Sequence, residues 1–225
     1  MDSRNIKIVS SIFEARYEPK VSARDQMGIF QDQFKDFKLN EIDPIRIQIG
    51  NSNQTKTKFL SIENIGVTNI PYQGSDTFIK ECKEITQFAS NQMNISHLNR
   101  IGIRLEMVIP LKDNEMGNET LNFFLKLFGK NAVNQLGQTM GGFNLEIGTN
   151  DNENKFKFSF QFARREDNNS KIFKDVPKQG LIIDADYSRE NVPLSDATEF
   201  IDNSINLITS KTRNFLGNFL IRSEK

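Results

Sequence analysis

The chain has 225 residues, 37% of them hydrophobic, which is enough apolar material for a packed core and disfavours an intrinsically disordered chain. Its 29 lysine and arginine residues balance 29 aspartate and glutamate residues, so no overall field attracts it to nucleic acid or to an anionic membrane. A single cysteine excludes an internal disulfide, and no apolar run reaches the length of a membrane span, so we expect a cytoplasmic protein.

Apolar periodicity predicts the elements of the first half of the chain. Alternation of apolar and polar residues is typical of strands, and apolar residues three or four positions apart are typical of amphipathic helices. The predicted elements are a strand at 6–17, a helix at 21–37, strands at 45–50 and 56–66, a helix at 76–93 and a strand at 97–110.

The second half of the chain contains predicted strands and helices in a different order. We expect a helix at 118–129, strands at 143–149, 155–163 and 180–188, and a long closing helix at 196–216. Because strand and helix do not alternate regularly, the order predicts an α+β fold with a mainly antiparallel sheet flanked by amphipathic helices. The chain divides into two similar strand-and-helix halves, 1–112 and 113–225, or forms one domain, 1–225.

The segment "KFKFSFQFARR" at 155–165 places four phenylalanines on one face of a strand. Such a row is either a platform for stacking nucleic-acid bases or the inner face of a core strand. RNA-recognition sheets carry glycines between their aromatic residues, and this segment has none. Burial of each ring is worth about 2–3 kcal/mol, so we predict that the row faces the core.

Basic residues accompany this row on the opposite face and at its end. They are Lys155, Lys157, Arg164 and Arg165. They form either an edge that contacts phosphates or an ordinary solvated face of an antiparallel sheet, and we favour the second.

Two aspartates, Asp184 and Asp186, share one face of a later strand at a spacing of about 7 Å. With a third carboxylate, for which Glu146 is the candidate, they would hold a divalent cation of the kind that nucleases use. Two aspartates on a polar strand face are common without a metal, and we favour that interpretation.

Side chains for nucleophilic or acid–base chemistry are scarce. His97 is the only histidine, and Cys82 is the only cysteine. Cys82 lies on the apolar stripe of its predicted helix, where a thiol behaves as a small hydrophobe rather than as a nucleophile. A Cys82–His97 pair is therefore disfavoured.

The strand at 97–110 carries polar residues on one face: Arg100, Arg104 and Glu106, with Gly102 between the arginines. A glycine there leaves space for a group to approach the backbone, and two arginines suit a carboxylate or a phosphate. The alternative, which we favour, is an internal salt bridge with Glu14 or Glu106.

The segment "NRIGIRLEMVIP" resembles the central signature, approximately "RIGLRYIN", of a sporadically distributed family of uncharacterised bacterial and archaeal proteins. The match runs from Arg100 to Arg104, and Leu105, Glu106 and Met107 depart from it. The opening "EARYEP" and the closing helix are also similar. The patchy occurrence of that family implies a setting such as phage defence, counter-defence or partnership with a toxin.

Together these observations predict a non-enzymatic protein without a cofactor that binds another macromolecule, most plausibly a protein. The alternative is a nucleic-acid-binding protein or a metal-dependent nuclease that uses the basic residues at 155–165 and the aspartate pair. The closing helix has apolar residues at alternating spacings of four and three, which predicts packing on its own sheet or a homo-oligomer through this helix. No membrane partner is expected.

Overall fold

The structure is a computed structural model that describes residues 5–112, 115–129, 144–151, 153–164 and 179–220. The elements are β1 (Lys7–Arg16), η2 (Val21–Gln26), α1 (Met27–Gln33), β2 (Lys38–Asp43), β3 (Arg46–Gly50), β4 (Lys56–Ser61), β5 (Asn64–Asn69), α2 (Ser75–Asn91), β6 (His97–Pro110), α3 (Met116–Phe128), β7 (Asn144–Asp151), β8 (Asn154–Arg164), β9 (Gln179–Pro193), η3 (Leu194–Asp196) and α5 (Ala197–Leu220). The fold is α+β, as predicted.

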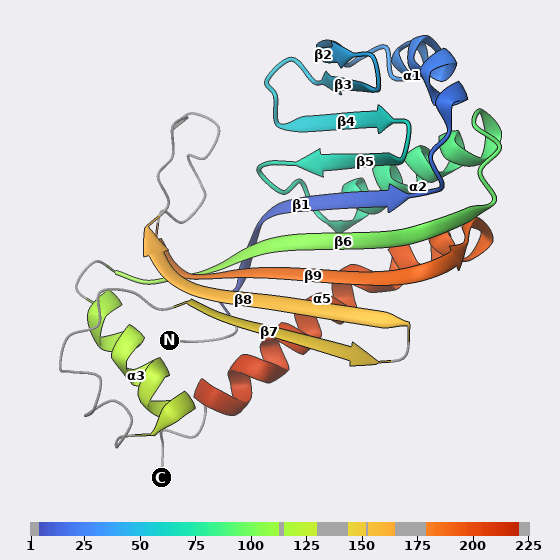
Figure 1. Ribbon diagram of the computed structural model, residues 1–225. Helices are drawn as coiled ribbons and strands as arrows, with labels where there is room; N and C mark the ends of the chain where they lie inside the picture. The colour runs from blue at the N-terminus through green and yellow to red at the C-terminus, as the bar shows by residue number, and fades with distance from the viewer. Residues whose placement is uncertain (1–4, 113–114, 130–143, 152, 165–178, 221–225) are drawn as a thin grey trace.

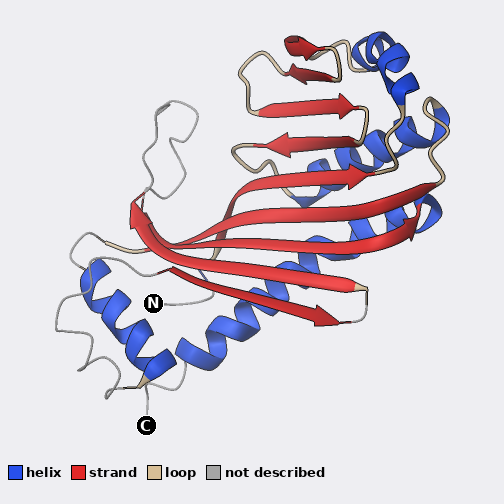
Figure 2. Cartoon of the chain, in the orientation of Figure 1, coloured by secondary structure: helices blue, strands red, loops and turns tan. Residues whose placement is uncertain are grey.

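Within the described residues, nine strands form one antiparallel sheet in the order β2-β3-β4-β5-β1-β6-β9-β8-β7. The sheet takes strands from both predicted halves, and the long pairing of β6 with β9 joins them. Helices α2 and α5 lie behind the sheet in Figures 1 and 2, and the opposite face looks toward the viewer. We call the face covered by helices the helix face and the other the open face.

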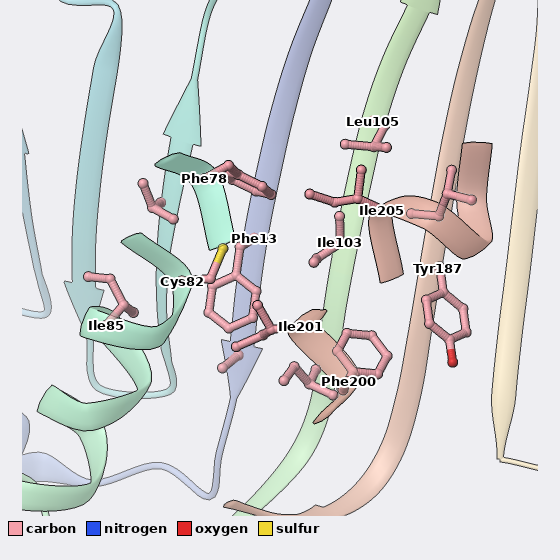
Figure 3. Close-up of a cluster of buried hydrophobic side chains, with 14 of the residues drawn as sticks. Phe13, Phe78, Cys82, Ile85, Ile103, Leu105, Tyr187, Phe200, Ile201 and Ile205 are labelled. Carbon is pink, nitrogen blue, oxygen red and sulfur yellow. The ribbon is translucent and has the colours of Figure 1, made fainter. Parts of the chain in front are cut away.

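The core lies between the sheet and its helices, because alternate side chains of each strand point to the helix face. On β6 the residues Ile101, Ile103 and Leu105 are fully buried there. Figure 3 shows how side chains from β1, β6 and β9 meet those from α2 and α5. The 24-residue helix α5 buries its apolar stripe against the sheet of its own chain; the buried residues are Ala197, Phe200, Ile201, Ile205, Ile208 and Leu216.

Two strands differ from the sequence-based prediction. The segment predicted as one strand at 56–66 is two strands, β4 and β5, which are joined by a tight turn. The Ser61 hydroxyl stabilises this turn by accepting hydrogen bonds from the main-chain N–H groups of Glu63 and Asn64, at 3.2 and 3.0 Å. The turn contains no glycine or proline, and serine favours turns more weakly, so the strand prediction continued through it.

Strand β2 was not predicted at all. All six of its residues are exposed, so burial imposes no alternation on its sequence. A bulge at Asn40 also shifts its register against β3 by one residue, which removes the strict period of two.

Candidate binding site on the open face of the sheet

The open face carries charged side chains on its central strands. The register of the sheet places Arg104 of β6 directly opposite Asp186 of β9, which in turn lies opposite Lys157 of β8. One row further, Glu106 lies opposite Asp184. The sheet therefore brings together the predicted site residues of β6, β8 and β9, which are far apart in the sequence.

Arg100 lies on this face on the inner strand β6, near the start of the strand. Its Nη2 atom donates to both carboxylate oxygens of Asp186, at 2.8 and 3.0 Å, and its Nη1 atom is 3.6 Å from Glu14 Oε1. The guanidinium folds over Gly102, where an added Cβ would come within 3.0 Å of it. The glycine between the two arginines thus makes room for the Arg100 side chain itself, and the favoured salt bridge with Glu14 is present.

Arg104 forms a second paired contact on the same face. Its Nε atom donates to Asp184 Oδ1 at 2.7 Å, and its Nη2 atom donates to Asp184 Oδ2, so the contact is bidentate. These hydrogen bonds raise the pKa of Arg104. Burial raises the pKa of Asp186, and the positive charges of Arg100 and Arg104 oppose this effect.

The two predicted basic residues on β8 are also paired. Lys155 Nζ is 2.6 Å from Glu190 Oε1, and Lys157 Nζ is 2.9 Å from Glu146 Oε1. Glu146, the candidate third metal ligand, is thus an ion-pair partner of a lysine. Arg164 ends β8, and Arg165 lies outside the described residues.

The aspartate pair shares one strand face, as predicted, but each carboxylate accepts hydrogen bonds from an arginine. Within the described ranges, no three histidine, cysteine, aspartate or glutamate side chains are grouped so that they could hold a metal ion. The geometry of Asp184 and Asp186 is that of salt bridges.

A hollow of about 530 Å³ lies in the middle of the open face, between β1 and β6. Arg16, Glu14 and Arg104 line it together with Ile12. Its volume is in the range of ligand pockets, but its walls are mostly charged, whereas small-molecule pockets are mostly apolar. The hollow therefore lacks the apolar lining that is typical of small-molecule pockets.

The phenylalanine row points away from this site. Phe156, Phe160 and Phe162 are buried on the helix face, and Phe158 is partly buried there. The ring of Phe160 stacks on Phe215 of α5, with centroids 4.9 Å apart. The row is a core face, as predicted, and offers no platform for bases.

Cys82 is not placed as the nucleophile of a cysteine–histidine catalytic pair. Cys82 lies on α2 with no exposed surface, and burial raises the pKa of its thiol well above the usual value. His97 is exposed at the first residue of β6. The thiolate form that catalysis would require is therefore disfavoured.

Sequence reasoning missed a buried lysine on the helix face. Lys58 of β4 is 1% exposed; its Nζ atom lies 3.2 Å from Glu84 Oε2 and 4.0 Å from the centre of the Phe34 ring. Nearby, Lys56 Nζ is 2.7 Å from Glu81 Oε1. The sequence did contain a signal for these ion pairs. Lys56 and Lys58 are two positions apart on a strand, and Glu81 and Glu84, their partners, are three positions apart on a helix.

Burial lowers the pKa of Lys58, and Glu84 opposes this effect. Below the lowered pKa both folded and unfolded chains bind the proton. As the pH rises from there toward the unfolded value, the unfolded chain binds more protons than the folded one, so Lys58 should make the protein more stable with rising pH. Urea unfolding of both proteins between pH 7 and pH 10 measures this effect: the free energy of unfolding of wild type minus that of Lys58→Met should rise across the range.

The exposed Lys80 of α2 offers the matched control. Lys80→Met should follow the pH profile of the unmodified protein. If the stability difference between wild type and Lys58→Met stays flat or falls with rising pH, Lys58 is not desolvated as described.

No family model matches the chain, and no curated protein does. Among solved structures, a rolling circle replication initiator protein from Geobacillus stearothermophilus aligns with 89% of this chain and 80% of its own, at 10% identity and a TM-score of 0.35. None of the described helices combines the length and the apolar character needed to cross a membrane.

Proposed function

We propose that this is a non-enzymatic binding protein whose open sheet face recognises another protein through charged side chains of both signs. The single observation that supports the proposal most strongly is that five ion pairs join neighbouring strands across this face in the described part of the chain. They are Arg100–Glu14, Arg100–Asp186, Arg104–Asp184, Lys155–Glu190 and Lys157–Glu146.

The balance of charge argues against a phosphate backbone as the partner. A nucleic-acid-binding face gains affinity by releasing counterions when unpaired lysines and arginines meet phosphates. Here the arginines of β6 and the lysines of β8 already have carboxylate partners, so a phosphate would have to displace a carboxylate at each position. A protein surface that carries both positive and negative side chains can instead offer a new partner of opposite charge to each member of an ion pair.

The size of the face fits a protein partner. The strands β1, β6, β9, β8 and β7 lie side by side. At about 4.8 Å per strand and about 3.3 Å per residue, a stretch ten residues long covers roughly 800 Å². That is about the area that one partner contributes to a standard protein–protein interface. Arginine is enriched in such interfaces, and Arg100 and Arg104 both lie on this face.

Isolation of the tagged protein from its native cells tests the proposal. We expect a protein to copurify in a fixed ratio with wild type and to be at least about tenfold depleted with Arg104→Glu, which would cost the complex about 1.4 kcal/mol. Asn203→Glu, an exposed position on α5 on the other side of the molecule, should leave the ratio unchanged. Equal recovery with both variants would contradict the proposal.

The same preparations distinguish the nucleic-acid alternative. Mobility-shift assays with DNA and RNA over a salt series should show no specific complex, and incubation with Mg²⁺ should produce no cleavage. Binding that weakens steeply with salt, or cleavage that requires the metal and is lost in Asp184→Asn, would overturn protein recognition in favour of a nucleic-acid function.

A further inference from the structure

Strand β2 leaves one edge of the sheet without a strand partner in the described part of the chain, and this edge exposes apolar side chains among its charged ones. Leu39 and Ile42 are 45% and 58% exposed, and Ile45 just beyond the strand is 45% exposed. Exposed apolar side chains on an edge strand favour pairing with another strand. At the other edge, Leu145 and Ile147 of β7 pack against the core of their own chain.

The bulge in β2 places its two apolar residues on one side. Leu39 lies opposite Ile49 and Ile42 lies opposite Ile47, although an odd and an even residue would normally point to different faces. Asn40 is the extra residue. Since Ile47 and Ile49 are fully buried on the helix face, Leu39 and Ile42 extend the apolar layer beyond the end of the sheet.

Side-chain hydrogen bonds hold the bulge in place. Asn40 Nδ2 donates to Gln54 Oε1 at 2.7 Å, and Gln54 Nε2 donates back to Asn40 Oδ1 at 2.9 Å. Gly50 leaves the space for this pair, since a Cβ there would lie 2.5 Å from the Asn40 amide nitrogen. The shape of the edge is therefore fixed before any partner arrives.

We propose that β2 pairs antiparallel with β2 of a second copy of this chain, about a two-fold axis between Asn40 and Glu41. In this register Lys38 of each copy lies opposite Asp43 of the other, Leu39 lies opposite Ile42, and Asn40 lies opposite Glu41. Opposite charges meet on one face and apolar side chains meet on the other, and the two bulges lie opposite each other.

The same residues exclude neighbouring registers. A shift by one residue in one direction places Glu41 opposite Glu41 of the second copy; a shift in the other direction places Leu39 opposite Glu41 and Lys38 opposite Ile42. Charged residues and a bulge normally protect an edge strand from indiscriminate pairing. Of these three registers only the proposed one is self-complementary, which supports a second copy as the partner.

This dimer differs from one formed through the C-terminal helix, whose apolar stripe is buried in its own chain. It also leaves the open face free, so it does not depend on the proposed function. A six-residue strand pair buries less than a standard interface, so we expect a dissociation constant of about 1–100 µM.

Sedimentation velocity from about 1 to 500 µM tests the dimer, because that range brackets the expected dissociation constant. Wild type should convert from monomer to dimer across the range. Lys38→Asp alone places aspartate opposite Asp43, and Asp43→Lys alone places lysine opposite Lys38, so each variant should dimerise about tenfold more weakly. An equimolar mixture of the two variants should dimerise as wild type does, because both charge pairs are then opposite in sign.

The mixture separates the interface from folding, since two misfolded variants would not restore association. Lys7→Asp, at an exposed position on β1, should dimerise as wild type does. The proposal is overturned if wild type stays monomeric at 500 µM, if the single variants dimerise normally, or if the mixture fails to recover.

Discussion

Phe160→Ala is expected to lower the free energy of unfolding by about 3–5 kcal/mol, the usual cost of removing a large aromatic side chain from a core. Phe160 has no exposed surface. Its ring lies 4.9 Å from that of Phe215 on α5 and 6.4 Å from that of Phe123 on α3. The truncation would therefore leave a cavity where β8 meets both helices. Chemical denaturation monitored by circular dichroism measures the loss.

The neighbouring Gln161 provides the control, because it is exposed on the open face of the same strand. Gln161→Ala should change the free energy of unfolding by less than about 0.5 kcal/mol. If the two variants were equally stable, the phenylalanine row would not be a core face. Loss of nucleic-acid binding in Phe160→Ala with no loss of stability would point to the stacking platform instead.

Gly66→Ala is expected to cost about 2–3 kcal/mol, because extra atoms in a tight site force neighbours to move. Gly66 lies in β5 between β4 and β1. An added Cβ would overlap the main-chain oxygen of Phe13 and lie 2.5 Å from Cζ of Phe59. The ring can rotate away, but the oxygen belongs to a paired central strand and cannot. The thermal midpoint should fall accordingly.

Gly28 is the matched control for this substitution. It lies in α1, and nothing lies within 4 Å of a Cβ added there. Gly28→Ala should be neutral or should stabilise the protein by up to about 1 kcal/mol, since alanine is the better helix former. A Gly66→Ala protein as stable as Gly28→Ala would show that β5 is not packed between its neighbours as described.

Long, strongly patterned elements were predictable from the sequence. The alternation around Ile101, Ile103 and Leu105 and the stripe around Phe78, Cys82 and Ile85 each identify one buried face, and the structure buries all six residues. In both cases burial of one face requires apolar residues at a fixed spacing. That spacing in the sequence therefore predicts which residues are buried. The antiparallel α+β fold followed from the order of the elements.

Features that depend on distant contacts were not predictable. Nothing in "KLNEID" marks β2, because its position is fixed by pairing with β3 and by the Asn40–Gln54 hydrogen bonds. The strand order is another such feature, since β1 lies between β5 and β6 after a long excursion of the chain. No local pattern encodes which strand becomes a neighbour.

The sequence identified the residues of the candidate site but not their arrangement in space. The sequence singled out Arg100, Arg104, Asp184 and Asp186 in separate groups, one basic and one acidic. Only the β6–β9 register shows that the groups neutralise each other, with Arg104 bidentate on Asp184 and Arg100 bound to Asp186. This neutralisation is the reason why we propose protein recognition rather than phosphate recognition.

Site-specific photo-crosslinking in the native cells tests protein recognition by the open face most directly. A photoreactive amino acid at Ile12, which lines the central hollow between β1 and β6, should crosslink to one protein in defined yield. The same residue at Asn203 on α5 should not. The yield at Ile12 should fall in the Arg104→Glu background. Crosslinks from Ile12 to nucleic acid, or equal yields from Ile12 and Asn203, would contradict the account.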